Sequence, residues 1–352
     1  MKKYGWGIAY GLLLTLFTVY VLLDTFVIAR VYSEVPQGKV ELADKGNSVE
    51  QDASLGNDKE EGDSEGNREE SITAPEEPEK QEGTEKTEEP EIPERPEMQE
   101  SPEPVWKTPV ITENSYDDGL ISIVITEYRE YDTAIYAAEV KLASAEYLRT
   151  ALAKNSYGRN VTQRTSTMAA NNNAIFAVNG DYYGARENGY VLRNGVLYRE
   201  TAAKNQEDLV IYPDGNFEII TESEVSAAEL YEKGAQQVLA FGPALVTDGE
   251  ISVTEWDEVG QASASNPRTA IGIIDDLHYI IVVSDGRTRA SAGLSLYELA
   301  LFMQSQGAKT AYNLDGGGSA TMVFNNKIIN KPTTNGWQIK ERSVSDCVFI
   351  GY

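Results

Sequence analysis

Residues 311–324 read Ala-Tyr-Asn-Leu-Asp-Gly-Gly-Gly-Ser-Ala-Thr-Met-Val-Phe, and the stretch changes character at one carboxylate, Asp315. It begins as an apolar run typical of a buried strand, breaks into three glycines, and resumes as a run rich in β-forming residues. Consecutive glycines weaken a strand, so they are expected where the backbone turns sharply or closely approaches another group. An ordinary Asp-Gly turn needs fewer residues than this. The stretch therefore predicts a ligand-facing loop at the end of a strand.

The segment before this strand is predicted to be a helix over Ser295–Gln306. Ser295 and Glu298 have the spacing of a capping box, in which each side chain accepts a hydrogen bond from an otherwise unpaired backbone N–H group. Apolar residues then recur on one face, and Gly307 follows where helices commonly end. We expect this helix to pack on a sheet and to lead directly into the strand that ends at Asp315.

The sequence from Val110 onward has the composition of a globular domain that is long enough for a substantial core. Asn194-Gly195 and Asp214-Gly215 each separate two strand-like runs and predict hairpins. Strands are also expected over residues 120–127, 134–142, 174–179, 238–241, 244–247, 269–274, 279–284 and 347–350. Helices are expected over 165–172 and 225–233, and a short helix or irregular segment over 144–153. These features predict a single α+β domain over residues 110–352, with a mixed sheet and packed helices.

The N-terminus resembles a membrane anchor. Residues 1–4 include Lys2 and Lys3, and residues 5–29 are apolar apart from Asp24 and a few hydroxyl and aromatic groups. A run of roughly 20 apolar residues spans a bilayer. A cleaved signal peptide is the alternative, because residues 27–29 offer a plausible cleavage position, but signal cores are usually only about 7–15 residues long. We therefore expect an uncleaved single-pass anchor in the cell membrane, with a cytoplasmic N-terminus and the C-terminal domain extracellular.

Residues 30–109 are predicted to be a disordered linker rich in Glu and Pro. From Asp44 to Glu103 there are 22 acidic and 6 basic residues, a net charge of −16, and six of the 13 prolines. Such a segment cannot bury enough apolar surface to offset its chain entropy and is extended by its own charge. Most of the net charge of −26 therefore belongs to the linker, and neither part of the chain is suited to binding nucleic acid.

Polar residues recur where the predicted strands stop, and strand ends are rigid positions for functional groups. The clusters are Asn179-Gly180-Asp181, Asn266-Pro267-Arg268-Thr269, Asp285-Gly286-Arg287, Asn313 through Ser319, and Glu341-Arg342. Each cluster alone is weak evidence, because Asp-Gly and Asn-Gly usually mark turns. Together they favour one convergent site.

The sequence does not indicate catalysis by histidine or cysteine, a zinc site or a nucleotide-binding motif. His278, the only histidine, lies beside two aspartates at a strand edge and is more typical of a surface residue than of a catalyst. Cys347, the only cysteine, lies in a predicted strand and is more typical of a core residue than of a nucleophile. No zinc spacing, Walker loop or dinucleotide fingerprint occurs. The sequence thus predicts no cofactor, and a metal held by Asp181, Asp285 and Asp315 is only an alternative, since loop carboxylates are usually solvated.

The remaining groups are carboxylates and arginines. Carboxylates supply the acid and the base or nucleophile of glycoside hydrolysis, and arginine presents a planar fork that matches phosphate oxygens. Backbone N–H groups of a glycine-rich loop can also surround an anion. This combination indicates glycosyl chemistry on a substrate that carries phosphate.

A set of ordered motifs resembles the phosphodiester glycosidase family, an animal member of which removes N-acetylglucosamine from a sugar 1-phosphodiester. The motifs, spread over residues 174–352, are Asn179-Gly180, Pro267-Arg268-Thr269-Ala270, Asp285-Gly286-Arg287, Gly293 through Ala300, Asn313 through Ser319, Asn330-Lys331-Pro332 and Glu341 through Ser345. The resemblance implies a hydrolase that acts on a sugar 1-phosphodiester in a surface or exogenous glycopolymer. Some bacterial members of the family are linked to exopolysaccharide.

The resemblance and the strand-end clusters together assign the candidate roles. Asp315 and Asp285 are the expected acid and base pair, with Glu341 in reserve. Arg268 and Arg342 are expected to hold phosphate. The other candidate substrate-binding residues are Asn179, Gly180, Asp181, Thr269, Arg287, Asn313, Gly316, Gly317, Gly318 and Ser319.

Two departures from the family pattern indicate a substrate different from that of the animal enzyme. Asp181 stands where the family commonly has a further glycine, which adds a carboxylate, and Asn266 stands where a histidine is often found before Pro-Arg. The alternative class is a non-hydrolytic module that binds glycans or assembles exopolysaccharide, which would keep the cleft but lack a positioned acid.

Overall fold

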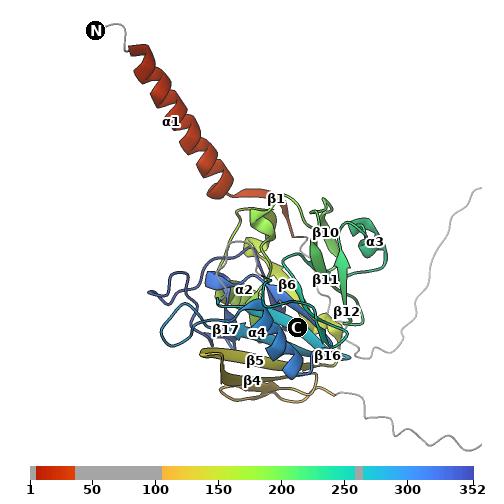
Figure 1. Cartoon of the computed structure of the whole chain (residues 1–352). Coiled ribbons are helices and arrows are strands. Elements are labelled where there is room, and N and C mark those ends of the chain that lie inside the picture. Colours follow the sequence, from red (N-terminus) through yellow and green to blue (C-terminus); the bar gives the residue numbers. More distant parts are fainter. Residues whose placement is uncertain (1–4, 36–104, 258–264) are drawn as a thin grey trace, which may run out of the picture. The chain divides into compact units, whose positions relative to one another are not determined.

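The computed structural model describes residues 5–35, 105–257 and 265–352 of the chain. All of these belong to one unit, formed by residues 1–36 together with residues 103–352. The predicted acidic linker, over residues 36–104, lies outside the described residues. Figure 1 shows the arrangement of the labelled elements.

The N-terminal apolar segment forms helix α1 (Gly5–Phe26), which is long and apolar enough to cross a membrane. It is followed, after three residues, by strand β1 (Arg30–Glu34), which pairs antiparallel with β7 (Ser156–Arg159). The prediction that the disordered linker begins at Arg30 is therefore wrong for residues 30–34. The reason is local: Arg-Val-Tyr-Ser-Glu contains β-branched and aromatic residues and has strand propensity, unlike the Glu- and Pro-rich sequence after it.

The largest sheet in the described part of the chain has nine strands, and six of them were expected from the sequence. In spatial order they are β15 (Glu250–Ile251), β14 (Ala244–Thr247), β18 (Thr310–Leu314), β16 (Thr269–Asp275), β17 (His278–Ser284), β5 (Thr133–Leu142), β4 (Ile121–Glu130), β3 (Ser115–Asp117) and β2 (Val110–Ile111). β17 is buried on both faces, which explains its nearly continuous apolar sequence.

Two further sheets have five strands each. One has the order β20 (Lys327–Ile328), β19 (Met322–Phe324), β8 (Phe176–Asn179), β21 (Asp346–Ile350) and β6 (Leu148–Leu152). The other has the order β10 (Val196–Arg199), β9 (Val191–Arg193), β13 (Gln237–Leu239), β11 (Glu207–Ile211) and β12 (Phe217–Thr221). Both predicted hairpins, β9–β10 and β11–β12, are confirmed.

The described strands differ from the mixed sheet that the sequence predicts. Every strand pair in the described part of the chain is antiparallel, although a helical crossover, α4 (Leu296–Ser305), connects β17 to β18. This crossover makes β17 and β18 run in the same direction, but β16 lies between them and pairs antiparallel with both. The described part of the domain is dominated by sheets and contains few helices.

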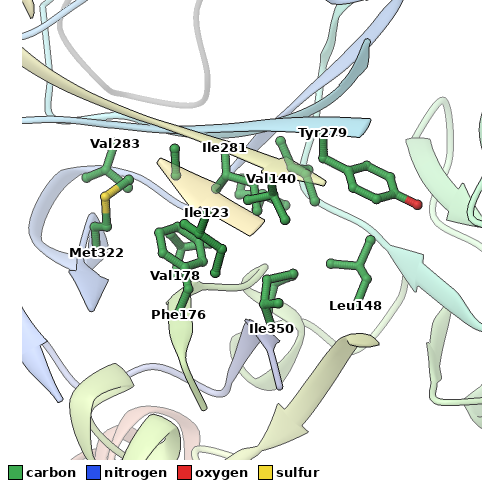
Figure 2. Close-up of a cluster of buried hydrophobic side chains, with 14 of the residues drawn as sticks. Ile123, Val140, Leu148, Phe176, Val178, Tyr279, Ile281, Val283, Met322 and Ile350 are labelled. Atoms are coloured by element: carbon green, nitrogen blue, oxygen red, sulfur yellow. The ribbon is translucent and has the colours of Figure 1, made fainter. Parts of the chain in front are cut away.

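The main core lies between the nine-stranded sheet and the two smaller sheets. Alternate residues of β4, β5 and β17, such as Ile123, Val140 and Ile281, face Phe176 and Ile350 of the second sheet (Figure 2). Strand residues alternate between faces, so the intervening residues of β5 and β17 face the other way. That opposite face of the large sheet is covered by α4.

The helices cover the outer faces of the sheets. α4 begins with the predicted capping box and buries Leu296, Leu299, Ala300 and Met303. α2 (Thr165–Asn171) packs on the second sheet, and α3 (Ala227–Glu232) packs on the third. The expectation of a short helix or irregular segment over residues 144–153 is wrong: a 3₁₀ turn at Ala145–Tyr147 leads into β6, and five residues there pair with β21.

The loop after Asp315 connects the two main sheets. β18 belongs to the nine-stranded sheet and β19 to the second sheet, and residues 315–321 pass between them through a 3₁₀ turn at Gly317–Ser319. This loop is therefore held at both ends by strands of different layers.

Candidate active site

The glycine loop packs closely against neighbouring backbone. A Cβ atom added to Gly316 would lie 2.7 Å from the Pro267 carbonyl oxygen, and one on Gly318 would lie 3.1 Å from Thr334 Cα. Gly317 has a φ of +57°, in the region that favours glycine. The glycine loop therefore approaches other groups closely, as predicted. Those groups belong to other loops of the same protein.

The backbone N–H groups of this loop are partly occupied. Gly317 N donates to Pro267 O at 2.7 Å, and Ser319 N donates to Gly316 O at 3.1 Å. The anion cradle predicted from the glycine run thus loses these two donors. Side-chain guanidinium groups surround the loop instead.

Asp315 forms a cluster with Arg342 and Ser319. Arg342 Nη2 lies 3.0 Å from Asp315 Oδ2, and Arg342 also donates to Ser319 Oγ from Nε at 2.9 Å and from Nη2 at 2.6 Å. Burial raises the pKa of Asp315, while the Arg342 charge and a hydrogen bond from Ser319 act in the opposite direction. Asp315 therefore combines a raised pKa with a fixed orientation, which suits proton transfer.

Two cavities meet at this cluster. The serine-lined cavity, defined by Ser319, Ser343 and Ser345 in its wall, has a volume of about 210 Å³. The arginine-lined cavity, defined by Arg268, Arg287 and Arg342, has a volume of about 180 Å³. Asp315 and Arg342 line both cavities. One carboxylate and one guanidinium thus stand at the boundary between them.

The arginines that line the arginine-lined cavity are held in place by hydrogen bonds. Arg287 donates to Asn266 Oδ1 at 3.1 and 2.8 Å and to Thr334 O at 2.7 Å, which holds its guanidinium in place. Arg268 is almost fully buried, and its Nε donates to Leu294 O at 2.9 Å. Burial and the nearby Arg342 charge lower the pKa of Arg287. Three guanidinium groups accompany one carboxylate here, an arrangement that favours an anion.

Asp181 lines the serine-lined cavity, but its carboxylate is fully engaged inside the protein. Oδ1 accepts from Tyr183 N at 2.8 Å, and Oδ2 accepts from Ala240 N at 2.9 Å and from Arg193 Nη2 at 2.7 Å. Arg193 also pairs with Asp346, whose pKa is raised to about 7 by burial and by the Asp181 charge. Asp181 therefore forms part of a buried ionic network as well as part of the cavity wall.

Two of the three predicted catalytic carboxylates lie outside both cavities. Asp285 Oδ1 accepts from Lys331 N at 2.7 Å, and burial raises its pKa. Glu341 accepts from Ser166 N at 3.0 Å and from Ser166 Oγ at 2.5 Å, so it caps the first turn of α2. Neither residue lines the cavities that contain Asp315.

Four other predicted binding residues form hydrogen bonds or packing contacts inside the protein. Asn179 Nδ2 donates to Asp315 O at 2.5 Å, and its Oδ1 accepts from Thr269 Oγ1 at 2.9 Å. Asn313 Nδ2 donates to Gly242 O at 2.7 Å. Gly180 packs against the Asp346 carboxylate. Asn179 thus holds the backbone of Asp315, and none of these residues lines either cavity.

Several wall residues were missing from the sequence prediction. Asn160, Thr162, Tyr182 and Ser343 line the serine-lined cavity. Asn160 follows directly after β7, so the strand-end signal used elsewhere could have found it. Arg193 was missed because it lies within a strand, where sequence alone shows no ionic partner.

The two residues judged unsuited to catalysis have other partners. His278 Nε2 lies 2.8 Å from Glu139 Oε1, and Cys347 is buried in β21. Within residues 5–35, 105–257 and 265–352, no group of three or more His, Cys, Asp or Glu side chains is arranged to hold a metal ion.

Comparisons with known proteins agree with this arrangement of motifs. The family model described as phosphodiester glycosidase matches residues 172–351. The chain is 31% identical over 203 residues to the SPbeta prophage-derived uncharacterized protein YomE of Bacillus subtilis (strain 168), covering 56% of this chain and 31% of that protein. It is 36% identical over 108 residues to N-acetylglucosamine-1-phosphodiester alpha-N-acetylglucosaminidase of Mus musculus, covering 28% of this chain and 20% of the mouse protein.

A solved structure shows a similar fold. It is the catalytic domain of the zebrafish N-acetylglucosamine-1-phosphodiester alpha-N-acetylglucosaminidase, auto-inhibited by its pro-peptide, with a TM-score of 0.53 and 19% identity. The similarity covers 66% of this chain and 83% of that one. At this identity the likeness concerns the fold alone. The chain spans less than a third of the length of the curated relatives named above, 31% and 20%.

Proposed function

Because this chain belongs to the phosphodiester glycosidase family, we propose that its domain hydrolyses the bond between a sugar C1 atom and a phosphodiester group in a cell-surface glycan. The observation that carries the proposal is the shared position of Asp315 and Arg342 in the walls of both cavities. A sugar in the serine-lined cavity and its phosphate in the arginine-lined cavity would place the glycosidic bond beside Asp315.

The contents of the two cavities support this orientation of the substrate. Hydroxyl and amide groups of Asn160, Thr162 and Ser343 suit the hydroxyl and N-acetyl groups of a sugar such as N-acetylglucosamine. The guanidinium groups of Arg268, Arg287 and Arg342 suit phosphate oxygens. The substrate would therefore cross the boundary between the cavities at its C1–O bond.

In the proposed reaction a water molecule attacks C1 while Asp315 accepts the proton of that water. The bond between C1 and the phosphate oxygen breaks, its electron pair leaves with the phosphate monoester, and the sugar is released with the hydroxyl group from water. The raised pKa of Asp315 makes it a stronger base than an exposed aspartate. Positive charge develops at the sugar in the transition state and is stabilised by the carboxylate.

The leaving group explains why Asp315 can act without a second catalytic carboxylate. A phosphate oxygen is a much weaker base than the alcohol oxygen of an ordinary glycoside, so it can leave without a proton from an acid. The guanidinium groups would stabilise the charge that develops on it. The role proposed for the arginines thus replaces one member of the acid and base pair that the sequence predicted from Asp315 and Asp285.

The location of the reaction is part of the same proposal. Helix α1 would anchor the chain, and the lysines before it would keep the N-terminus in the cytoplasm. The domain would then act outside the membrane, on a glycan of the cell surface or an exopolysaccharide.

The test uses the full chain with a panel of sugar 1-phosphodiesters and matching aryl glycosides, in water labelled with heavy oxygen. We expect release of sugar and phosphate monoester, with the label in the sugar, because C1–O is the bond that breaks. Label in the phosphate would indicate P–O cleavage and a phosphodiesterase. Binding of the phosphodiester without turnover across the panel would indicate a glycan-binding module instead.

A further inference from the structure

The connection between the membrane-spanning helix and the domain is short. α1 ends at Phe26, and Arg30, the first residue of β1, already pairs with Arg159 of β7. Four residues can span at most about 14 Å. The end of β7 therefore lies within that reach of the end of the helix.

β1 is held to the domain by more than its strand pairing. The Tyr32 and Tyr157 rings lie 5.8 Å apart between centroids, and Val35 N donates to Asn155 O at 2.9 Å. The Val35 side chain packs against a buried cluster that includes Tyr183. The connection is thus an integral part of the fold, and it limits how far the domain can move from the bilayer.

The residue after β7 joins this connection to the site. Asn160 lines the serine-lined cavity, and its Nδ2 donates to the carbonyl oxygens of Thr25 at 3.1 Å and Ile28 at 3.2 Å. Asn160 N donates to the carbonyl oxygen of Gly184, another wall residue, at 2.9 Å. One side chain therefore contacts both the end of the membrane helix and the cavity that contains Asp315.

A basic cavity lies at the same end of the domain. This juxtamembrane cavity, about 210 Å³ in volume, is lined by four arginines and one glutamate: Arg30, Arg159, Arg186, Arg199 and Glu187. The turn at Tyr183–Ala185 separates it from the serine-lined cavity. Basic residues next to a bilayer attract lipid phosphate groups, so the surface beside the site suits a membrane that carries them.

The acidic segment does not set the distance between the membrane and the domain. Residues 36–104 lie between Val35 and Val105, and both of these belong to the same unit as the sheets. Val35 is fixed to Asn155, and Lys107 N donates to Asp118 O at 2.6 Å after the segment. The chain therefore reaches the domain before the acidic segment begins, whereas the sequence predicted that this segment links the anchor to the domain.

We propose that the substrate is borne by the membrane: a sugar joined through a phosphodiester to a lipid, whose head group enters the two cavities from the bilayer surface. This inference rests on the proposed function and narrows its substrate class. The short connection through β1 would keep the site at the depth of the head groups. A polymer far from the membrane would be reached poorly.

The test compares two substrates with the same sugar and phosphodiester, one carrying a long alkyl chain inserted in phospholipid vesicles and one carrying a short soluble alcohol. The full chain is reconstituted in the same vesicles. In the test variant, 20 Gly and Ser residues are inserted between Ala29 and Arg30, which adds about 25 Å of reach. The control carries the same insert within the acidic segment, after Glu70.

We expect the first insert to lower kcat/KM at least tenfold for the vesicle-borne substrate and to leave the soluble substrate unchanged. The control insert should change neither rate. Equal rates for the parent and the first insert on the vesicle-borne substrate would overturn the inference, and so would an equal loss from the control insert. Thermal unfolding of each protein, and an insert of half the length, separate a folding defect from a loss of reach. If the parent chain cleaves neither substrate, the proposed function itself fails.

Discussion

Two clusters of aspartate and arginine lie in this domain, and they differ in access and in balance of charge. In the first, Arg193 pairs with Asp181 and Asp346, and the paired side chains are at most 1% exposed. In the second, Asp315 pairs with Arg342, whose side chain is 40% exposed, and Arg268 and Arg287 lie in the same cavity wall. The first cluster has more carboxylates than arginines, and the second has more arginines than carboxylates.

The difference shows how the same residue types serve structure or chemistry. Buried charges are costly unless each is paired and hydrogen-bonded, and Asp181 has a donor on each oxygen. Such a group has no capacity left for a substrate. At the second cluster the Arg342 side chain is 40% exposed, so a bound anion can reach its guanidinium group. Three predictions test this distinction.

The largest effect is expected from Asp315→Asn. This change keeps the size of the side chain and removes the group that accepts a proton, so kcat should fall by about 10²–10⁴-fold. Thermal unfolding should change little, because the amide can still accept hydrogen bonds from Arg342 and Ser319. Near-normal turnover in a folded variant would show that Asp315 takes no part in catalysis. Asp285 and Glu341 would then be the candidate catalytic carboxylates.

The second prediction concerns the buried network. Arg193→Met leaves two buried carboxylates without their cation, so the free energy of unfolding should fall by about 3–5 kcal/mol. The matched control is Lys309→Met, which breaks an exposed pair with Asp275, 65% and 70% exposed, and should cost less than about 1 kcal/mol. Denaturant unfolding measures both. Equal losses in the two variants would mean that burial does not distinguish these ion pairs.

The smallest effect is a pH dependence of stability. Burial and the Asp181 charge raise the pKa of Asp346 to about 7. The folded state therefore holds this proton more tightly than the unfolded state does, so the stabilisation is complete below the ordinary aspartate pKa and is lost as pH rises to about 7. The wild type should lose up to about 1.4 kcal/mol per pH unit in this window relative to Asp346→Asn. Parallel unfolding curves for the two proteins across the window would contradict the prediction.

Local sequence determined most of the elements that position the site. The capping residues of α4, the turn residues of the two hairpins and the glycine run after Asp315 each act over a few neighbouring residues. The membrane-spanning length of α1 is likewise visible in its composition. Arg268, Arg287 and Arg342 were found because they lie in the polar clusters that the sequence places at the ends of predicted strands.

Only the tertiary structure decided which strand-end groups share a cavity. Glu341 and Arg342 are neighbours in the sequence, but one caps α2 and the other pairs with Asp315. Successive residues of an extended chain point in opposite directions, so the partner of each depends on what the fold packs on either side. Asp285 and Arg287, two residues apart, are also divided, between the Lys331 loop and the arginine-lined cavity, and here the chain is not extended, because Arg287 has a φ of +60°. The place of Arg30–Glu34 was decided likewise: its propensity allows a strand, but only the free edge of β7 determines where that strand pairs.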